Sequence, residues 1–166
     1  MARSEPGSAA VEVVIVFPAL FLVLGMLLET GVLATRSVML DRGLDIAARN
    51  LRLGYTVVVT QDSIRREVCE ASVIIVHCER DLIIELVEMD PATSYPRHQP
   101  TCRNRATAID PVIGFSAGGR NRIMVIRACV IVDPLFPGIG VGLALPRDRT
   151  GGYKLISYTA FLNEPS

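Results

Sequence analysis

The longest apolar pattern in the chain lies near its N-terminus, where sixteen residues from Val13 to Leu28 carry no charge. The apolar character extends more broadly from Ala9 to Ala34, and only Glu12 and Glu29 interrupt it. A helix over that range would be roughly 39 Å long, and the hydrocarbon core of a bilayer is about 30 Å thick. The pattern therefore predicts a helix that enters a membrane. Pro18 and Gly25 are compatible with this prediction because transmembrane helices tolerate both residues.

The helical pattern continues beyond the apolar run. Apolar residues recur at spacings of seven, four, three and four, which places them on one stripe of a helix: Leu33, Leu40, Leu44, Ala47 and Leu51. Charged residues fill the other faces, and Gly54 is a natural stop. We expect one helix from about Ala9 to Leu53, roughly 68 Å long, with Gly31 and Gly43 as flexible points.

The rest of the chain reads as a small mixed domain. The patterns predict a helix from about Gln61, with Ile64, Val68 and Ala71 on its inner face, and strands over Leu82–Met89, Ile123–Val132 and Tyr153–Asn163. Residues 73–76 fit a helix or a strand, and residues 77–81 read as a break. Long aperiodic segments cover residues 90–122 and 133–152. The predicted fold class is α+β, a long helix followed by a domain with a short antiparallel sheet. The expected segments are a short leader or tail over residues 1–7, the helix over 8–53 and the domain over 54–166.

Composition argues against several partners. Lys plus Arg and Asp plus Glu each number 17, so the balance of charge gives no reason to expect nucleic acid as a partner. The chain has no Trp and only 5% aromatic residues, so an aromatic platform for bases or sugars is not expected.

Four cysteines follow the apolar run and none precedes it. An even number in a small domain predicts two disulfides in an oxidising compartment. Four cysteines allow three pairings. We favour Cys69 with Cys78, which closes a short loop, and Cys102 with Cys129, which attaches the long loop to the clearest strand. A metal site that includes His77 and His98 is the alternative, but no Cys-x-x-Cys pair supports it.

Motifs of enzymes are present only as fragments. Residues 114–118 fit the pattern G-x-S-x-G around Ser116, but both histidines precede that serine and no strand is predicted before it. The glycines of residues 138–142 have neither dinucleotide-binding spacing nor a phosphate-binding Lys. Glu85 and Glu88 are expected on opposite sides of a strand, as solvent-facing charges at a sheet edge. We expect no catalytic residue, metal or cofactor.

Glu12 is a carboxylate one step inside the apolar run, where a charge needs a partner. It follows Gly7 by five residues, so cleavage after Gly7 would make Ser8 the first residue. The new α-amine would lie about one helical turn from Glu12, within one subunit or between neighbours. A glutamate that merely lies among lipid head groups is an equally good interpretation of the pattern.

The segment Gly7-Ser8-Ala9-Ala10-Val11-Glu12, followed by an apolar run containing Pro18, resembles the N-terminus of TadE-type proteins. These are minor pilins, or pseudopilins, of the tight-adherence (Tad/Flp) pilus system. The C-terminal Asn163-Glu164-Pro165 is similar to the ending common in that family, whereas residues 127–137 depart from its pattern. The resemblance implies a leader removed after Gly7 by a prepilin peptidase, and Glu12 as the assembly carboxylate.

The implied function is structural, in pilus biogenesis and assembly. The implied partners are the major Flp-type pilin, other minor pilins, the inner-membrane assembly platform and the prepilin peptidase. The implied location is the bacterial inner membrane, crossed once, with a periplasmic C-terminal domain, or the pilus itself. Arg36, Arg42 and Arg49 after the span slightly favour the opposite orientation by the positive-inside rule. The cysteines and the resemblance outweigh them.

Two alternatives predict a different mature N-terminus. An unprocessed membrane-anchored binding module would keep its leader. A secreted protein with a signal peptide would be cut after Val32-Leu33-Ala34, although its apolar region would be unusually long and Glu29 would fall at the cleavage region.

Overall fold

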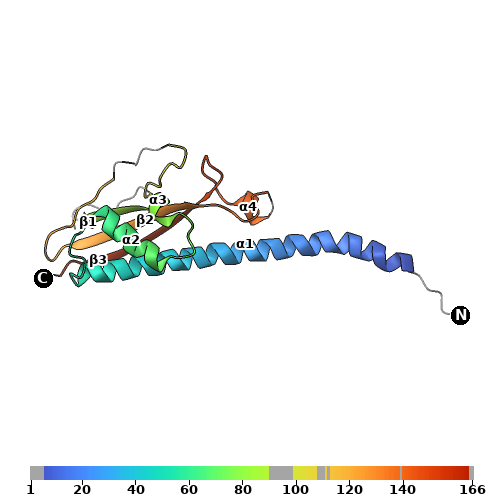
Figure 1. The fold of residues 1–166 in the computed structure, drawn as a ribbon, viewed down its shortest axis with the longest axis horizontal. Coiled ribbons are helices and arrows are strands. Elements are labelled where there is room, and N and C mark those ends of the chain that lie inside the picture. Colours follow the sequence, from blue (N-terminus) through green and yellow to red (C-terminus); the bar gives the residue numbers. More distant parts are fainter. Residues whose placement is uncertain (1–5, 90–98, 108–110, 112, 139, 165–166) are drawn as a thin grey trace.

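A computed structural model describes the backbone of residues 6–89, 99–107, 111, 113–138 and 140–164, and the side chains of these residues from Ala10 onward. Its elements follow in the order α1 (Pro6–Arg52), α2 (Gln61–Ala71), α3 (Cys78–Asp81), β1 (Ile83–Met89), β2 (Ile123–Val132), α4 (Val141–Ala144) and β3 (Tyr153–Leu162). The chain therefore has the predicted α+β architecture, in which one long helix carries a small domain at its C-terminal half (Figure 1).

The three strands form one antiparallel sheet in the order β1-β2-β3. In the central strand, Ile126 lies opposite Leu86 of β1 and Thr159 of β3. All three strands match the sequence-based predictions to within one residue at either end. The central strand was the clearest prediction because it is rich in β-branched and apolar residues, with Arg127 as its one charge, and it is buried at every position after Ile123.

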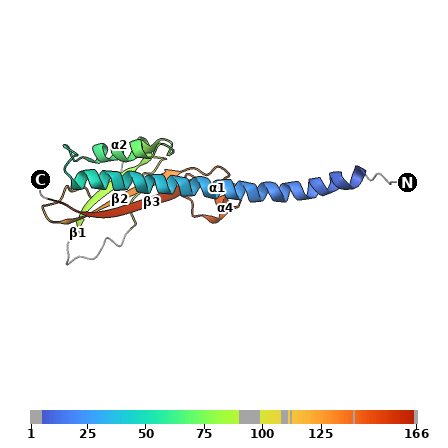
Figure 2. The ribbon, with the colours of Figure 1, turned by 90° about the horizontal axis from the view of Figure 1, so that it is seen from below.

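Helices α1 and α2 lie side by side over one face of the sheet (Figure 2). The predicted stripe of α1 supplies the core on this side: Leu40, Leu44, Ala47 and Leu51 are buried, and Leu33 packs against the cluster. From α2, Ile64 and Val68 are buried as predicted. Alternate residues of β2, including Ile126 and Ala128, complete this core.

The opposite face of the sheet is attached to residues 99–107. Cys102 and Cys129 form one disulfide, with 5.0 Å between their Cα atoms, and Cys69 and Cys78 form the other, with 5.6 Å. These are the two pairs that the sequence spacing favours. The first ties the aperiodic segment to the central strand, and the second ties the end of α2 to the start of α3.

The expected solvent-facing role of Glu85 is wrong. This carboxylate is 3% exposed and forms an ion pair with Arg127 on the neighbouring strand, where the two residues are directly opposite. It also accepts a hydrogen bond from the backbone amide of Thr101. Glu88, by contrast, is half-buried and pairs with Arg122. Single-strand periodicity could not reveal the Arg opposite Glu85, which follows it by 42 residues.

Two local expectations also need correction. Residues 77–81 are not simply a break, because Cys78–Asp81 forms the short helix α3 after His77 in the left-handed conformation. Residues 73–76, which fitted either a helix or a strand, form turns.

Gly43 is a point of close packing rather than a flexible hinge. A Cβ atom there would lie 2.7 Å from the carbonyl oxygen of Val68 and 2.7 Å from the hydroxyl oxygen of Ser72. The missing side chain therefore allows α1 and α2 to approach each other closely. Gly31, the other expected flexible point, lies in α1 with nothing within 4 Å of such an atom.

Substitution Gly43→Ala should lower the free energy of unfolding by about 1–3 kcal/mol, because the methyl group overpacks the contact between α1 and α2. The matched control Gly31→Ala has open space and should raise stability by about 0.5–1 kcal/mol through helix propensity. Chemical denaturation of the detergent-solubilised full chain measures both. Equal stability of the two variants would contradict the close-packing role.

Candidate functional site

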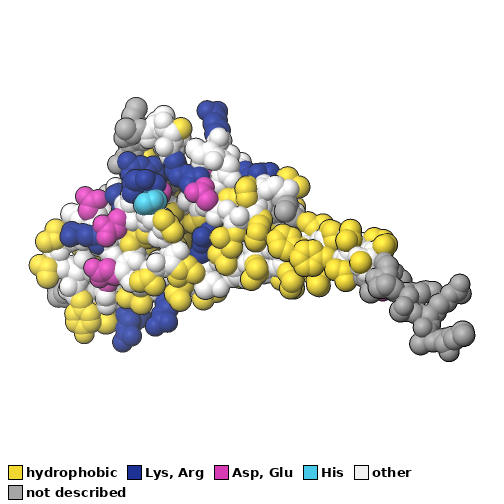
Figure 3. Space-filling view, turned by 45° about the vertical axis from the view of Figure 1, so that its right-hand side comes forward, with side chains coloured by type: hydrophobic (Ala, Val, Ile, Leu, Met, Phe, Trp, Pro, Cys, Tyr) yellow, Lys and Arg dark blue, Asp and Glu magenta, His cyan; other side chains and the backbone are white. Residues whose placement is uncertain are grey.

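The N-terminal half of α1 extends beyond the domain. Residues 10–24 are exposed on every side, and the helix is long and apolar enough to cross a membrane, the only such helix within the described residues. Figure 3 shows apolar side chains covering this projecting segment. We call residues 10–24 the free half of α1. Its length is about 22 Å, so a membrane span must also include the next turns of the helix.

Gly7 and Ser8 lie in the first turn of α1, which begins at Pro6 rather than near Ala9. Proline suits this position because the first backbone amides of a helix have no intrahelical acceptor. The same lack of hydrogen bonds means that the Gly7–Ser8 peptide bond can leave the helix at little cost. The rest of the predicted leader, residues 1–5, lies outside the described residues.

Glu12 lies on the free half and is exposed. It lines a shallow apolar hollow with Val13, Val16, Phe17 and Leu20, along one side of the helix. Its carboxylate forms no hydrogen bond or ion pair with the side chains and backbone that the structure describes. The structure thus leaves Glu12 available to a partner and surrounds it with apolar groups.

Glu29, by contrast, is only 2% exposed although it lies at the end of the apolar run. Its Oε2 atom accepts hydrogen bonds from the backbone amides of Leu135 and Phe136, both at 2.9 Å. These amides belong to the connection between β2 and β3. Glu29 was recognisable in the sequence as an isolated charge, but nothing local to it indicated a partner more than 100 residues away.

Close packing at Gly140 supports the contact around Glu29. Gly140 fits against Met26 so tightly that a Cβ atom would lie 2.5 Å from the Met26 side chain. Gly140 has a φ of 55°, which disfavours other residues as well. Contacts between α1 and the domain therefore begin at Met26 and Glu29, and continue along one face of the helix toward its end.

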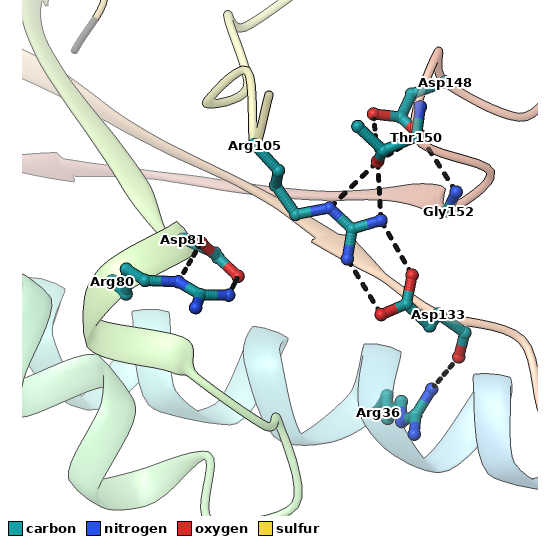
Figure 4. A network of polar contacts seen from close by, with 8 residues as sticks. All are labelled: Arg36, Arg80, Asp81, Arg105, Asp133, Asp148, Thr150 and Gly152. Carbon is teal, nitrogen blue, oxygen red and sulfur yellow. Dashed lines mark hydrogen bonds and ion pairs between the residues drawn. The ribbon is translucent and has the colours of Figure 1, made fainter. Parts of the chain in front are cut away.

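A polar network links the two ends of the connection between β2 and β3 (Figure 4). Arg105 donates two hydrogen bonds to the Asp133 carboxylate, at 2.7 and 2.9 Å, and two to the Thr150 hydroxyl. Thr150 in turn bonds to Asp148, and Arg36 of α1 donates to the Asp133 carbonyl at 2.8 Å. The bonds from Arg105 lower the pKa of Asp133, which therefore remains charged at neutral pH.

Tyr153 is the first residue of β3 and directly follows the same connection. It is buried, and its hydroxyl finds no hydrogen-bond partner in the described part of the chain. Burial raises the pKa of Tyr153, and the negative charge of Glu29 raises it further, whereas Arg147 acts in the opposite direction. This tyrosine therefore stays neutral at physiological pH and acts as packing material.

The described residues bring together none of the catalytic arrangements considered above. Ser116 lies in a short segment that pairs beside β1, with Phe115 bridged to Leu86, and not at a turn between a strand and a helix. No group of three metal-ligating side chains is found among the described residues. His98 lies outside them.

The C-terminal motif contacts α1 and the loop before β2. Glu164 pairs with Arg52 at 2.5 Å, and the Asn163 side-chain amide donates to the carbonyls of Ala117 and Gly119. These contacts place the end of the chain at the end of α1 farthest from the free half (Figure 1). Pro165 lies outside the described residues.

These features define a class of protein: a small disulfide-bonded α+β domain on a membrane-capable N-terminal helix. The family model of TadE-like proteins matches residues 7–49, which covers Gly7, Ser8, Glu12 and Glu29. The predicted resemblance is therefore confirmed over this segment, where the chain is similar to TadE-like proteins. This match suggests a role in the Tad pilus system. No curated protein and no solved structure gives a significant match.

Substitution Glu29→Ala should lower the free energy of unfolding by about 1–3 kcal/mol, because the amides of Leu135 and Phe136 lose their acceptor. Glu29→Gln keeps a side-chain oxygen and should cost less. Denaturation of the full chain in detergent, with exposed Glu70→Ala as the control, measures these changes. The role of Glu29 is contradicted if its alanine variant is as stable as the Glu70→Ala control.

Proposed function

We propose that the protein is a minor pilin, or pseudopilin, that takes part in the biogenesis and assembly of Tad/Flp pili. The observation that carries the proposal is the free half of α1, which is apolar except at Glu12 and exposed along its whole length. A surface of this kind suits lipid before assembly and other apolar helices afterwards. The TadE-like match covers this same segment and supports the proposal.

The proposed partners are the major Flp-type pilin, other minor pilins and the inner-membrane assembly platform. A prepilin peptidase would cleave between Gly7 and Ser8, and the chemistry of that step would belong to the peptidase. The domain would face the periplasm, since two disulfides require an oxidising compartment. The protein itself would be structural and not an enzyme.

Glu12 would set the axial register of assembly. In an apolar environment an isolated carboxylate is costly, and a neighbour's α-amine offsets part of that cost. The exposed position of Glu12 on the free half leaves it accessible to such an amine. A neighbouring subunit could satisfy it only at one axial offset, which would fix the stagger between helices.

Processing is tested by substitution Gly7→Lys, which should leave the leader attached because a long charged side chain does not fit a subsite that accepts glycine. The chain is expressed with a prepilin peptidase, recovered from membranes, and its N-terminus is determined. The parent and a Ser4→Lys control should begin at Ser8.

Each alternative gives a different N-terminus in the parent protein. An uncut start would favour the membrane-anchored binding module, and a start at Thr35 would favour the secreted protein. If the Gly7→Lys variant still begins at Ser8, the proposed processing site is contradicted.

The role of Glu12 is tested with the Glu12→Ala and Glu12→Gln variants. Both should be cleaved after Gly7 and fold normally, but both should crosslink poorly to partner pilins. Polar contacts between membrane helices contribute about 1–2 kcal/mol, so a severalfold loss of crosslinking is expected. Glu79→Ala, which removes an exposed carboxylate from the domain, is the control. Unchanged crosslinking of both Glu12 variants would leave Glu12 as a residue at head-group level only.

A further inference from the structure

The connection between β2 and β3 contains a second apolar segment that neither the family nor the proposed function explains. Residues 134–146, which we call the apolar connection, include no charged side chain and no side chain that forms hydrogen bonds. Charged residues flank it directly, Asp133 before it and Arg147 to Arg149 after it. Surface connections of a small soluble domain are usually polar, so this composition calls for an environment other than water.

The apolar connection lies where the domain comes closest to the free half of α1. Its backbone contacts Glu29, and Gly140 packs against Met26, within the last turns of the apolar run. Figure 1 shows α4, which forms part of the connection, beside α1 on the side of the sheet that faces the N-terminus. A membrane that holds the apolar run up to Leu28 must therefore reach the level of this connection.

Three leucines of the apolar connection are exposed rather than packed into the described part of the domain. Leu143 is 62% exposed, Leu135 is 49% exposed and Leu145 is 38% exposed. In Figure 3 the apolar surface of the free half continues onto this part of the domain. The described part of the chain leaves these leucines uncovered.

We propose that the apolar connection inserts into the outer leaflet of the membrane beside α1 and seats the domain on the lipid surface. This inference rests on the membrane anchorage of α1 and adds a second, interfacial contact to it. The exposed leucines would enter the boundary between head groups and acyl chains, where loss of contact with water is favourable. The partner of the apolar connection would be phospholipid, because its surface adjoins the free half of α1, which would itself lie in lipid.

The contact with Glu29 makes this insertion possible. A carboxylate and two free backbone amides would each be costly at the edge of the hydrocarbon region. Here the two amides donate to the Glu29 carboxylate at 2.9 Å, between α1 and the apolar connection. The backbone of the connection is also held by Arg147, which donates to the Pro137 carbonyl at 3.0 Å.

Cations lie where lipid phosphates would be. Arg147 and Arg149 follow the connection and Lys154 lies near the start of β3, and all three are exposed. A groove of about 720 Å³ between α1 and β3 has Arg147 and Lys154 among its lining residues and Leu33, Leu145 and Leu155 on its walls. Apolar walls beside exposed cations match the two chemical parts of a phospholipid.

Because the chain has no Trp, single tryptophans report on each position without background. We would place them at Leu143 and Leu135 in the apolar connection, at Leu22 in the free half, and at Val57, which is 93% exposed on the domain. The full chain is reconstituted into phosphatidylcholine–phosphatidylglycerol vesicles with brominated acyl chains, which quench only nearby tryptophans. Leu143→Trp and Leu135→Trp should lose much of their emission, Leu22→Trp should lose most, and Val57→Trp should keep it.

The inference is overturned if the Leu143→Trp and Leu135→Trp variants, at a high ratio of lipid to protein, are quenched no more strongly than Val57→Trp. If a second copy or another pilin covers this surface instead, dilution with lipid should leave both tryptophans unquenched, and the inference would again fail. Loss of quenching at Leu22→Trp as well would overturn the membrane anchorage itself, which separates the two failures. Both replaced leucines are exposed, so tryptophan should fit at either position without disturbing the fold. Agreement between the two variants also excludes an effect that is local to one position.

Discussion

The buried carboxylate of Glu29 is the constraint on which the arrangement of this protein depends. A charge in an apolar run must be neutralised or hydrogen-bonded, and Glu29 meets that requirement with two backbone amides from the far end of the domain. The contact fixes where the domain begins to cover α1. It thereby divides one continuous helix into a free half and a docked half that differ in exposure and in chemistry.

The two halves follow from their different sequences. From Gly25 onward one stripe of α1 is small or apolar and packs against the sheet, α2 and the connection, while charged residues lie on the outer faces. From Ala10 to Leu24 the helix is apolar except at Glu12, and all of these residues are exposed in the described structure. Under the proposed function, the docked half would hold the domain while the free half contacts lipid before assembly and other helices afterwards.

Sequence patterns predicted the parts of the fold that depend on neighbouring residues. The β-branched run of β2, the helical spacing of Leu33, Leu40 and Leu44, and the stop near Gly54 are local signals, and the structure follows them. The pairing of Glu85 with Arg127, the close contact at Gly43 and the bond between Glu29 and Leu135 depend on which distant segments meet. Periodicity carries no information about such meetings, so these three features needed the three-dimensional structure.

The most direct test of this account is amide hydrogen exchange of the full chain in phospholipid nanodiscs, read at Leu135 and Phe136. The hydrogen bonds to Glu29 predict slow exchange at both amides in the parent, and acceleration in Glu29→Ala but not in the Glu70→Ala control. Rapid exchange at both amides in the parent protein would contradict the account, because the domain would then not be docked on α1 at Glu29. The division of the helix into two halves at this residue would be lost with it.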